Sequence, residues 1–157
     1  MQFASEMMRP MRAVCQRVSQ ARVTIDGTVV AEIGHGLVVL VGIARADTAE
    51  AAERLAARVA RLRIFEGESP KFDRSLLDVG GEALVVSQFT LITELTRPKG
   101  NRPDFSGAAP AEVAKPLYER FTGELAGLGI SVKTGVFGAR MQVELVNEGP
   151  VTVILDA

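Results

Sequence analysis

The amino-acid sequence predicts a single α+β domain in which a mainly antiparallel, curved and barrel-like β-sheet is covered by two helices. Three observations support this fold class. The chain has 157 residues, a length typical of one domain with a well-buried core. Several segments show strand-like patterns, whereas only two have the spacing of an amphipathic helix. No internal repeat or interdomain linker is present, so we expect one folded unit.

The N-terminal part of the domain is expected to form three strands. Residues 12–25 are rich in valine and alternate imperfectly with polar side chains, as a half-buried strand does. Asp26-Gly27 is typical of a tight hairpin turn, because both residues tolerate positive φ, and residues 28–33 form the returning strand. Residues 37–43 are continuously apolar, which predicts a central strand buried on both faces.

The two expected helices occupy residues 48–62 and 110–128. The first follows a polar N-cap residue and carries apolar side chains at i, i+3, i+4 and i+7. The second starts at a proline, which the first turn tolerates, and stops at a glycine. Pro116 lacks a backbone N–H, so it should kink the second helix or shift its start.

The remaining segments are interpreted as two loops and three further strands. Residues 65–78 and 93–110 carry proline, glycine and charges, and both are expected to be loops. Strands are expected at residues 83–91, 141–145 and 151–155.

Composition and charge restrict the possible functions. A net charge of −1 argues against a protein that coats a nucleic-acid backbone, since that binding needs many cationic contacts. A nucleic acid gripped at one end remains possible. The single Cys15 cannot form an internal disulfide, which favours a reducing compartment. The longest apolar run, residues 37–44, is far shorter than the ~20 residues of a membrane span. We therefore expect a cytoplasmic protein without a membrane partner.

Residues 1–10 are interpreted as an N-terminal extension, and residues 11–157 as the domain. The extension contains Glu6, a single cation and no apolar core, which is not the pattern of a secretory signal. Patterned sequence begins at Met11.

The usual side chains of hydrolytic catalysis are nearly absent. A Ser-His-Asp or Cys-His hydrolase needs a base beside its nucleophile, and His35 is the only histidine. His35 lies between two glycines, which favours a simple turn. Cys15 lies in an apolar strand, where a buried, inert thiol is the expected state. One histidine and one cysteine do not make a zinc site, so we expect no metal and no cofactor.

Two polar interruptions at strand ends remain as candidate sites. Residues 87–91, Ser-Gln-Phe-Thr-Leu, follow a buried strand, where backbone N–H groups released from the sheet could bind an oxyanion. The alternative is a strand that emerges into solvent. Residues 147–150, Asn-Glu-Gly-Pro, interrupt two strands, and the alternative there is a tight hairpin or an edge bulge.

These two segments together resemble the D-aminoacyl-tRNA deacylase family, whose signatures are S-Q-F-T-L and N-x-G-P-V-T. Both signatures are intact, at residues 87–91 and 147–152, about 60 residues apart. The resemblance extends over residues 11–157 and includes the Q-R-V segment at residues 16–18, R-P-D-F at residues 102–105 and F-G-A at residues 137–139.

The resemblance implies roles for ten residues. Gly149 and Pro150 would form a cis peptide whose carbonyl oxygens face the substrate amine, and Arg17 would fix their orientation by donating hydrogen bonds. The segment with catalytic donors would comprise Ser87, Gln88, Phe89 and Thr90. The hydroxyl of Thr90 could be a nucleophile, but without an activating base a positioning role is favoured. The terminal adenosine would occupy a pocket formed by Phe137, Gly138 and Met141, which could equally be core residues.

The family resemblance also implies the reaction and the partners. The chain would hydrolyse the ester of D-aminoacyl-tRNA, using the ribose 2′-hydroxyl of the RNA instead of a protein base, and would accept glycyl-tRNA. It would act as a homodimer in which Gly149-Pro150 inserts into the partner's pocket and excludes L side chains by a clash. Two rival hypotheses are a tRNA-end-binding module without turnover and a conventional serine or cysteine esterase.

Overall fold

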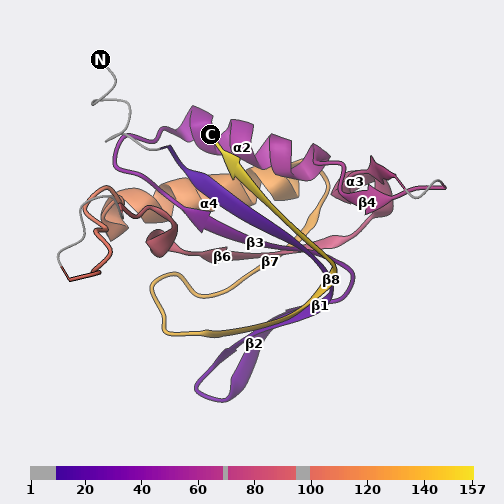
Figure 1. The fold of residues 1–157 in the computed structure, drawn as a ribbon, viewed down its shortest axis with the longest axis horizontal. Helices are drawn as coiled ribbons and strands as arrows, with labels where there is room; N and C mark the ends of the chain where they lie inside the picture. Colours follow the sequence, from indigo (N-terminus) through magenta and orange to yellow (C-terminus); the bar gives the residue numbers. More distant parts are fainter. Residues whose placement is uncertain (1–9, 69–70, 95–99) are drawn as a thin grey trace.

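The computed structural model describes residues 10–68, 71–94 and 100–157. The expected extension, residues 1–10, lies almost wholly outside the described residues, so its boundary stays a prediction. Figure 1 shows helices α2 (Ala49–Arg61) and α4 (Ala111–Gly127) on the same face of a strongly bent sheet. Among the described residues, no helix has the length and apolarity to cross a bilayer.

The sheet is mixed rather than mainly antiparallel throughout. Its hydrogen-bonded order is β2 (Thr28–Ile33), β1 (Arg12–Ile25), β3 (Gly36–Gly42), β6 (Glu82–Ser87) and β7 (Ser131–Thr134), with β8 (Gln142–Asp156) pairing β1. The three pairings of β1 are antiparallel, whereas β3–β6 and β6–β7 are parallel. Each parallel pairing is reached through a crossover that contains a helix, as parallel strands require. The predicted α+β class, with a barrel-like sheet, is confirmed.

Hydrophobic side chains fill both faces of the central strands. In β3, Leu37, Val39 and Val41 pack beneath the helices, while Val38 points into the hollow of the bent sheet. The run of residues 37–43 has no polar face because both faces of β3 are covered. The expectation of a central strand is therefore confirmed.

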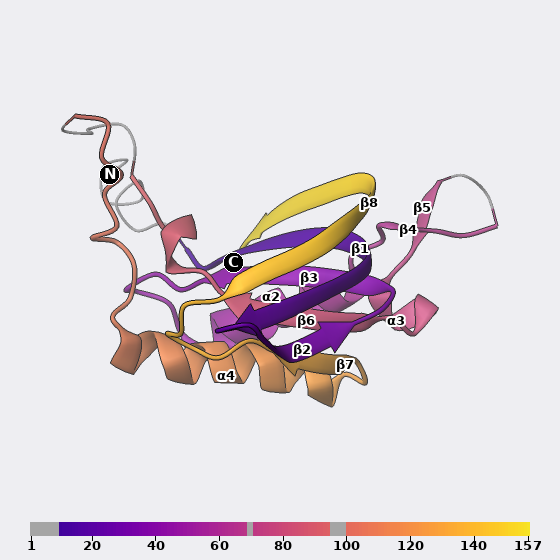
Figure 2. The same ribbon diagram turned by 90° about the horizontal axis from the view of Figure 1, so that it is seen from below.

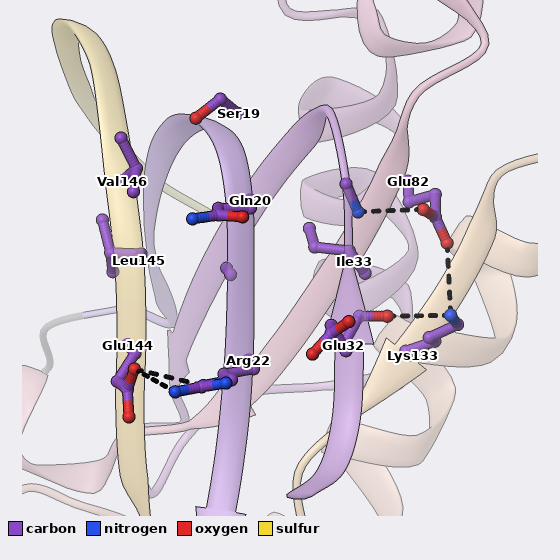
Figure 3. Close-up of a pocket in the computed structure, with 12 residues that line it drawn as sticks. Ser19, Gln20, Arg22, Glu32, Ile33, Glu82, Lys133, Glu144, Leu145 and Val146 are labelled. Carbon is purple, nitrogen blue, oxygen red and sulfur yellow. Dashed lines mark hydrogen bonds and ion pairs between the residues drawn. The ribbon is translucent and has the colours of Figure 1, made fainter.

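Side chains close the seam between the two edges of the sheet. Figure 3 shows Lys133 of β7 between Glu32 of β2 and Glu82 of β6. The Lys133 ammonium donates to the Glu32 carbonyl at 2.8 Å and lies 3.5 Å from the Glu82 carboxylate, which also accepts from the Gly34 N–H at 3.1 Å. A hollow of about 720 Å³ lies along this seam. The barrel is therefore closed by side chains rather than by a backbone ladder.

Two sequence expectations about helices need correction. Pro116 lies inside α4 without shifting its start at Ala111. It is exposed, so water can satisfy the carbonyl that loses its partner. A third, short helix, α3 (Leu76–Val79), lies in the segment expected to be a loop, and a Ser75–Asp78 capping box stabilises its first turn.

The remaining differences concern strands. The segment expected to be a loop also contains the hairpin of β4 (Phe65–Glu66) and β5 (Phe72–Arg74), which projects from one end of the molecule in Figure 2. The strand expected to reach residue 91 ends at Ser87 and continues as a 3-10 turn, η1 (Phe89–Leu91). Strand β7 was not expected, because its four residues are mostly exposed and carry no buried periodicity.

Candidate active site

The carboxyl end of β6, the first turn of α4 and the segment before β8 enclose a cavity of about 480 Å³. Ser87, Gln88 and Phe89 form one side of it, and Phe137, Gly138 and Met141 form the other. These six residues are far apart in sequence, and the fold brings them together. Thr90 does not line the cavity. Small alanine side chains on the helix side leave the room, namely Ala109, Ala111 and Ala114.

The aromatic wall of the cavity is fixed from behind. The ring of Phe137 packs against that of Tyr118 at a centroid distance of 5.7 Å. The Tyr118 hydroxyl donates to the Val85 carbonyl of β6 at 2.9 Å, and burial raises the pKa of that hydroxyl well above its usual value. Gly138 has φ of +77°, a conformation that other residues rarely adopt, so the backbone can turn close to the cavity. The Phe137 ring therefore has a defined orientation.

The turn that follows β6 determines which backbone donors are free. The Gln88 N–H donates to the Val41 carbonyl at 2.8 Å, so it extends the sheet and is not available to a substrate. The Phe89 and Thr90 N–H groups open η1, where a helix leaves its first N–H groups without partners inside the turn. The Gln88 side-chain amide donates to the Thr90 hydroxyl. The expected backbone donors near residues 87–89 are therefore narrowed to Phe89 and Thr90.

Neither His35 nor Cys15 can assist a nucleophile in this cavity. Gly36, next to His35, pairs with Glu82, and Val41 pairs with Ser87. The imidazole thus lies roughly five residues, or about 17 Å, along the strands from Ser87. Burial raises the pKa of the Cys15 thiol to about 12, so it stays protonated and unreactive. Within the described part of the chain, no group of three or more potential metal ligands occurs.

The second signature forms a bulge in β8 rather than a hairpin. Gln16 of β1 pairs with Thr152 and Val18 pairs with Asn147, so four residues of β8 bulge out opposite a single residue of β1. This bulge loop, residues 148–151, contains the Gly149-Pro150 peptide, which is cis, and both residues are exposed. Strand β8 lies at the edge of the sheet, where a proline costs no ladder bond.

Asn147 closes the bulge loop. Its side-chain oxygen accepts the Val151 N–H at 2.9 Å, and its side-chain nitrogen donates to the Thr152 hydroxyl at 3.0 Å. The Gln16 amide donates to the same hydroxyl at 3.3 Å. The asparagine of the signature therefore shapes the loop from within, a role that sequence reasoning missed.

Arg17 supports the bulge loop from below. It is 7% exposed, and it donates to the Glu148 carbonyl at 3.0 Å and to the Ile64 carbonyl at 2.9 Å. The accepting carbonyl belongs to the residue before Gly149, and not to Gly149 or Pro150. A Cβ on Gly149 would lie 3.2 Å from a guanidinium nitrogen, so the loop backbone rests directly on Arg17.

The bulge loop and the cavity do not meet within one chain. None of Arg17, Gly149 and Pro150 lines the cavity. Along β3, the partner of Arg17 is Leu37, whereas the cavity begins beyond Val41. Figure 2 shows the corresponding ends of the molecule, with the start of α4 at one end and the β4–β5 hairpin at the other.

Comparisons with known proteins agree with this geometry. A family model described as D-Tyr-tRNA(Tyr) deacylase matches residues 14–156. The chain belongs to this deacylase family. The family expected from the two motifs is confirmed, and with it the expectation of a hydrolase.

Relatives and solved structures extend the likeness over the whole domain. A D-aminoacyl-tRNA deacylase of Roseiflexus castenholzii is 58% identical over 147 residues, covering 94% of this chain and 92% of the relative. One of Deinococcus radiodurans is 52% identical, covering 93% and 99%. A structure titled "c-Myc DNA Unwinding Element Binding Protein" is 42% identical with a TM-score of 0.86, covering 93% and 98%. A probable eukaryotic D-amino acid tRNA deacylase is 21% identical with a TM-score of 0.78, covering 94% and 99%, and supports the fold alone.

Proposed function

We propose that this member of the deacylase family hydrolyses the ester bond that joins a D-amino acid to the 3′-terminal adenosine of tRNA. The observation that carries the proposal is the cavity in which Ser87–Phe89 meet Phe137–Met141, beside backbone N–H groups and without a usable side-chain base. The relatives' names indicate the same reaction. Because tRNA charging takes place there, we also place the protein in the cytoplasm.

The cavity suits the terminal adenosine. Its volume of about 480 Å³ lies in the usual range of roughly 300–1,000 Å³ for small-molecule sites. The Phe137 ring offers a stacking face, and base–aromatic stacking is worth roughly 1–3 kcal/mol. Gly138 allows the backbone to approach the nucleoside, and Met141 adds a polarizable apolar surface. This binding at one small site is compatible with a net charge of −1.

Catalysis is assigned to the RNA and to the backbone. The ribose 2′-hydroxyl next to the ester assists the hydrolysis, and the Phe89 and Thr90 N–H groups stabilise the oxyanion that forms on the ester carbonyl. The Thr90 hydroxyl accepts from the Gln88 amide, which supports a positioning role for this pair. No covalent acyl-enzyme and no metal ion are required.

Selectivity is assigned to the bulge loop of a second subunit. The exposed Gly149-Pro150 segment cannot reach the cavity of its own chain, so we propose a homodimer in which it enters the partner's cavity. Its carbonyl oxygens would accept from the substrate α-amino group. An L side chain would then collide with the loop backbone, whereas a D side chain would point away. Glycine has no side chain to exclude, so glycyl-tRNA would also be hydrolysed.

The decisive experiment compares D-tyrosyl-tRNA with L-tyrosyl-tRNA. Rapid loss of the D ester alone is expected, and equal persistence of both would support a tRNA-end-binding module instead. D-tyrosyl-tRNA ending in 2′-deoxyadenosine should resist hydrolysis, whereas rapid cleavage would indicate a protein nucleophile. His35→Ala and Cys15→Ala variants should stay active, and inactivity of either would favour the conventional esterase. The duplex-DNA function in one relative's title finds no support in the net charge of −1.

A further inference from the structure

The β4–β5 hairpin covers the buried arginine that supports the bulge loop. The guanidinium carbon of Arg17 lies 5.8 Å from the centroid of the Phe72 ring. The Glu66 carboxylate on the same hairpin approaches a guanidinium nitrogen at 3.8 Å. Arg17 is thus held between the carbonyls of Ile64 and Glu148 and the side chains of this hairpin.

The Phe72 side chain is unusual for an exposed phenylalanine. Its residue is 53% exposed, yet its ring contacts the cation of a residue that is only 7% exposed. A ring over a guanidinium attracts it through the π face and excludes water from that side. The Glu66 carboxylate is 60% exposed at its side chain, so its contribution through solvent is small. Among these contacts, the ring is therefore the principal feature of the hairpin that restricts Arg17.

We propose that Phe72 is a positioning residue for stereoselectivity, because its ring fixes Arg17, which in turn fixes the Glu148 carbonyl at the base of the bulge loop. The inference rests on the proposed role of Gly149-Pro150 as the filter against L side chains. Phe72 itself touches neither substrate nor the reacting atoms. It acts through one bond, the 3.0 Å hydrogen bond between Arg17 and Glu148.

The mechanism affects the two enantiomers differently. Exclusion by a clash requires a loop that does not yield, and Arg17 resists displacement of the loop because its nitrogen lies against Gly149. Without the ring, water reaches the guanidinium and its orientation broadens. An L side chain then pushes the loop aside more easily, whereas a D side chain does not contact the loop. The L rate should rise while the D rate stays nearly constant.

The test measures kcat/KM for D-tyrosyl-tRNA and L-tyrosyl-tRNA with Phe72→Ala, Phe72→Leu and Phe72→Tyr. For Phe72→Ala we expect the ratio of the D to the L value to fall twofold to fivefold, the equivalent of ~0.5–1 kcal/mol for a cation–π contact near the surface. Phe72→Leu should match Phe72→Ala, and Phe72→Tyr should restore the ratio. Val29→Ala, which truncates another exposed apolar side chain (45% exposed), should leave it unchanged.

Each other outcome overturns the inference. An unchanged ratio in Phe72→Ala, or equal losses in both rates, would reduce Phe72 to a structural residue. Wild-type selectivity in Phe72→Leu would remove the role of the aromatic face. If the unaltered enzyme shows no preference for the D ester, the proposed function fails first, and that result is distinct from a selective enzyme that is indifferent to Phe72.

Discussion

Replacing Asn147 by alanine should destabilise the protein by about 2 kcal/mol. The change removes both hydrogen bonds that close the bulge loop, to the Val151 N–H at 2.9 Å and to the Thr152 hydroxyl at 3.0 Å. Val151 is 9% exposed, so its N–H would be left poorly solvated, at a cost of roughly 1–3 kcal/mol. The Thr152 hydroxyl is exposed and still has Gln16 as a partner, so its loss adds only a few tenths.

Urea unfolding at matched protein concentration measures this difference, since dimerisation would otherwise shift the midpoint. For a chain of this size, about 2 kcal/mol corresponds to a fall in Tm of roughly 4–8 °C. Asn147→Asp is the control, because its carboxylate keeps the acceptor for Val151 and accepts from the Thr152 hydroxyl. If Asn147→Ala unfolds within 0.5 kcal/mol of the wild type, the loop does not depend on this side chain.

Three further predictions address the cavity, the seam and the buried thiol. Ala114→Leu extends a side chain into the cavity, so hydrolysis of D-tyrosyl-tRNA should fall at least tenfold while circular dichroism stays unchanged. Lys133→Met removes the donor to Glu32 and should lower urea stability by ~0.5–1 kcal/mol, whereas Lys133→Arg should keep most of it. Burial raises the pKa of Cys15 from 9.0 to about 12, so the folded state retains its thiol proton longer than the unfolded chain. Stability should therefore fall as pH rises from about 9 to 10, and this loss should be smaller by up to about 1 kcal/mol in Cys15→Ala, as judged by urea unfolding at both pH values.

Sequence patterns predicted the elements whose burial is periodic. Residues 37–43 and the helix beginning after Thr48 carry their environment in their own side chains, and both lie where expected. Strand β8 shows the limit of this reasoning. Gly149-Pro150 breaks the strand pattern, and only the register with β1 reveals that one strand continues on both sides of a bulge. Local composition contains no information about that register.

The candidate site was predictable in its parts but not in its arrangement. The motifs identified residues 87–90 and 149–150, and the resemblance supplied Phe137, yet neither indicated that the two motifs lie apart within one chain. The Phe72–Arg17 contact could not be found, because residues 65–78 have the composition of a loop and a cation–π contact has no sequence period. The occupied Gln88 N–H likewise depends on β3, a strand more than forty residues earlier.

The separation of loop and cavity leads to a test by complementation between subunits. Ala114→Leu disables the cavity but leaves the loop intact. Gly149→Val disables the loop but leaves the cavity intact, because Gly149 has φ of +133° and a Cβ there would meet Val151 at 2.8 Å and Arg17 at 3.2 Å. Each variant alone should hydrolyse D-tyrosyl-tRNA poorly.

In a heterodimer of these two variants, one composite site joins the intact cavity to the intact loop, and the other joins the two damaged parts. Co-expression with two different tags, followed by purification through both, isolates this heterodimer. If the loop acts across the interface, its activity per dimer should be about half that of the wild type, because one of two sites is whole. If the loop acted on its own chain, every site would contain one damaged part and no activity would return. The structure favours the first result, since Gly149 and Pro150 are exposed and absent from the wall of their own cavity.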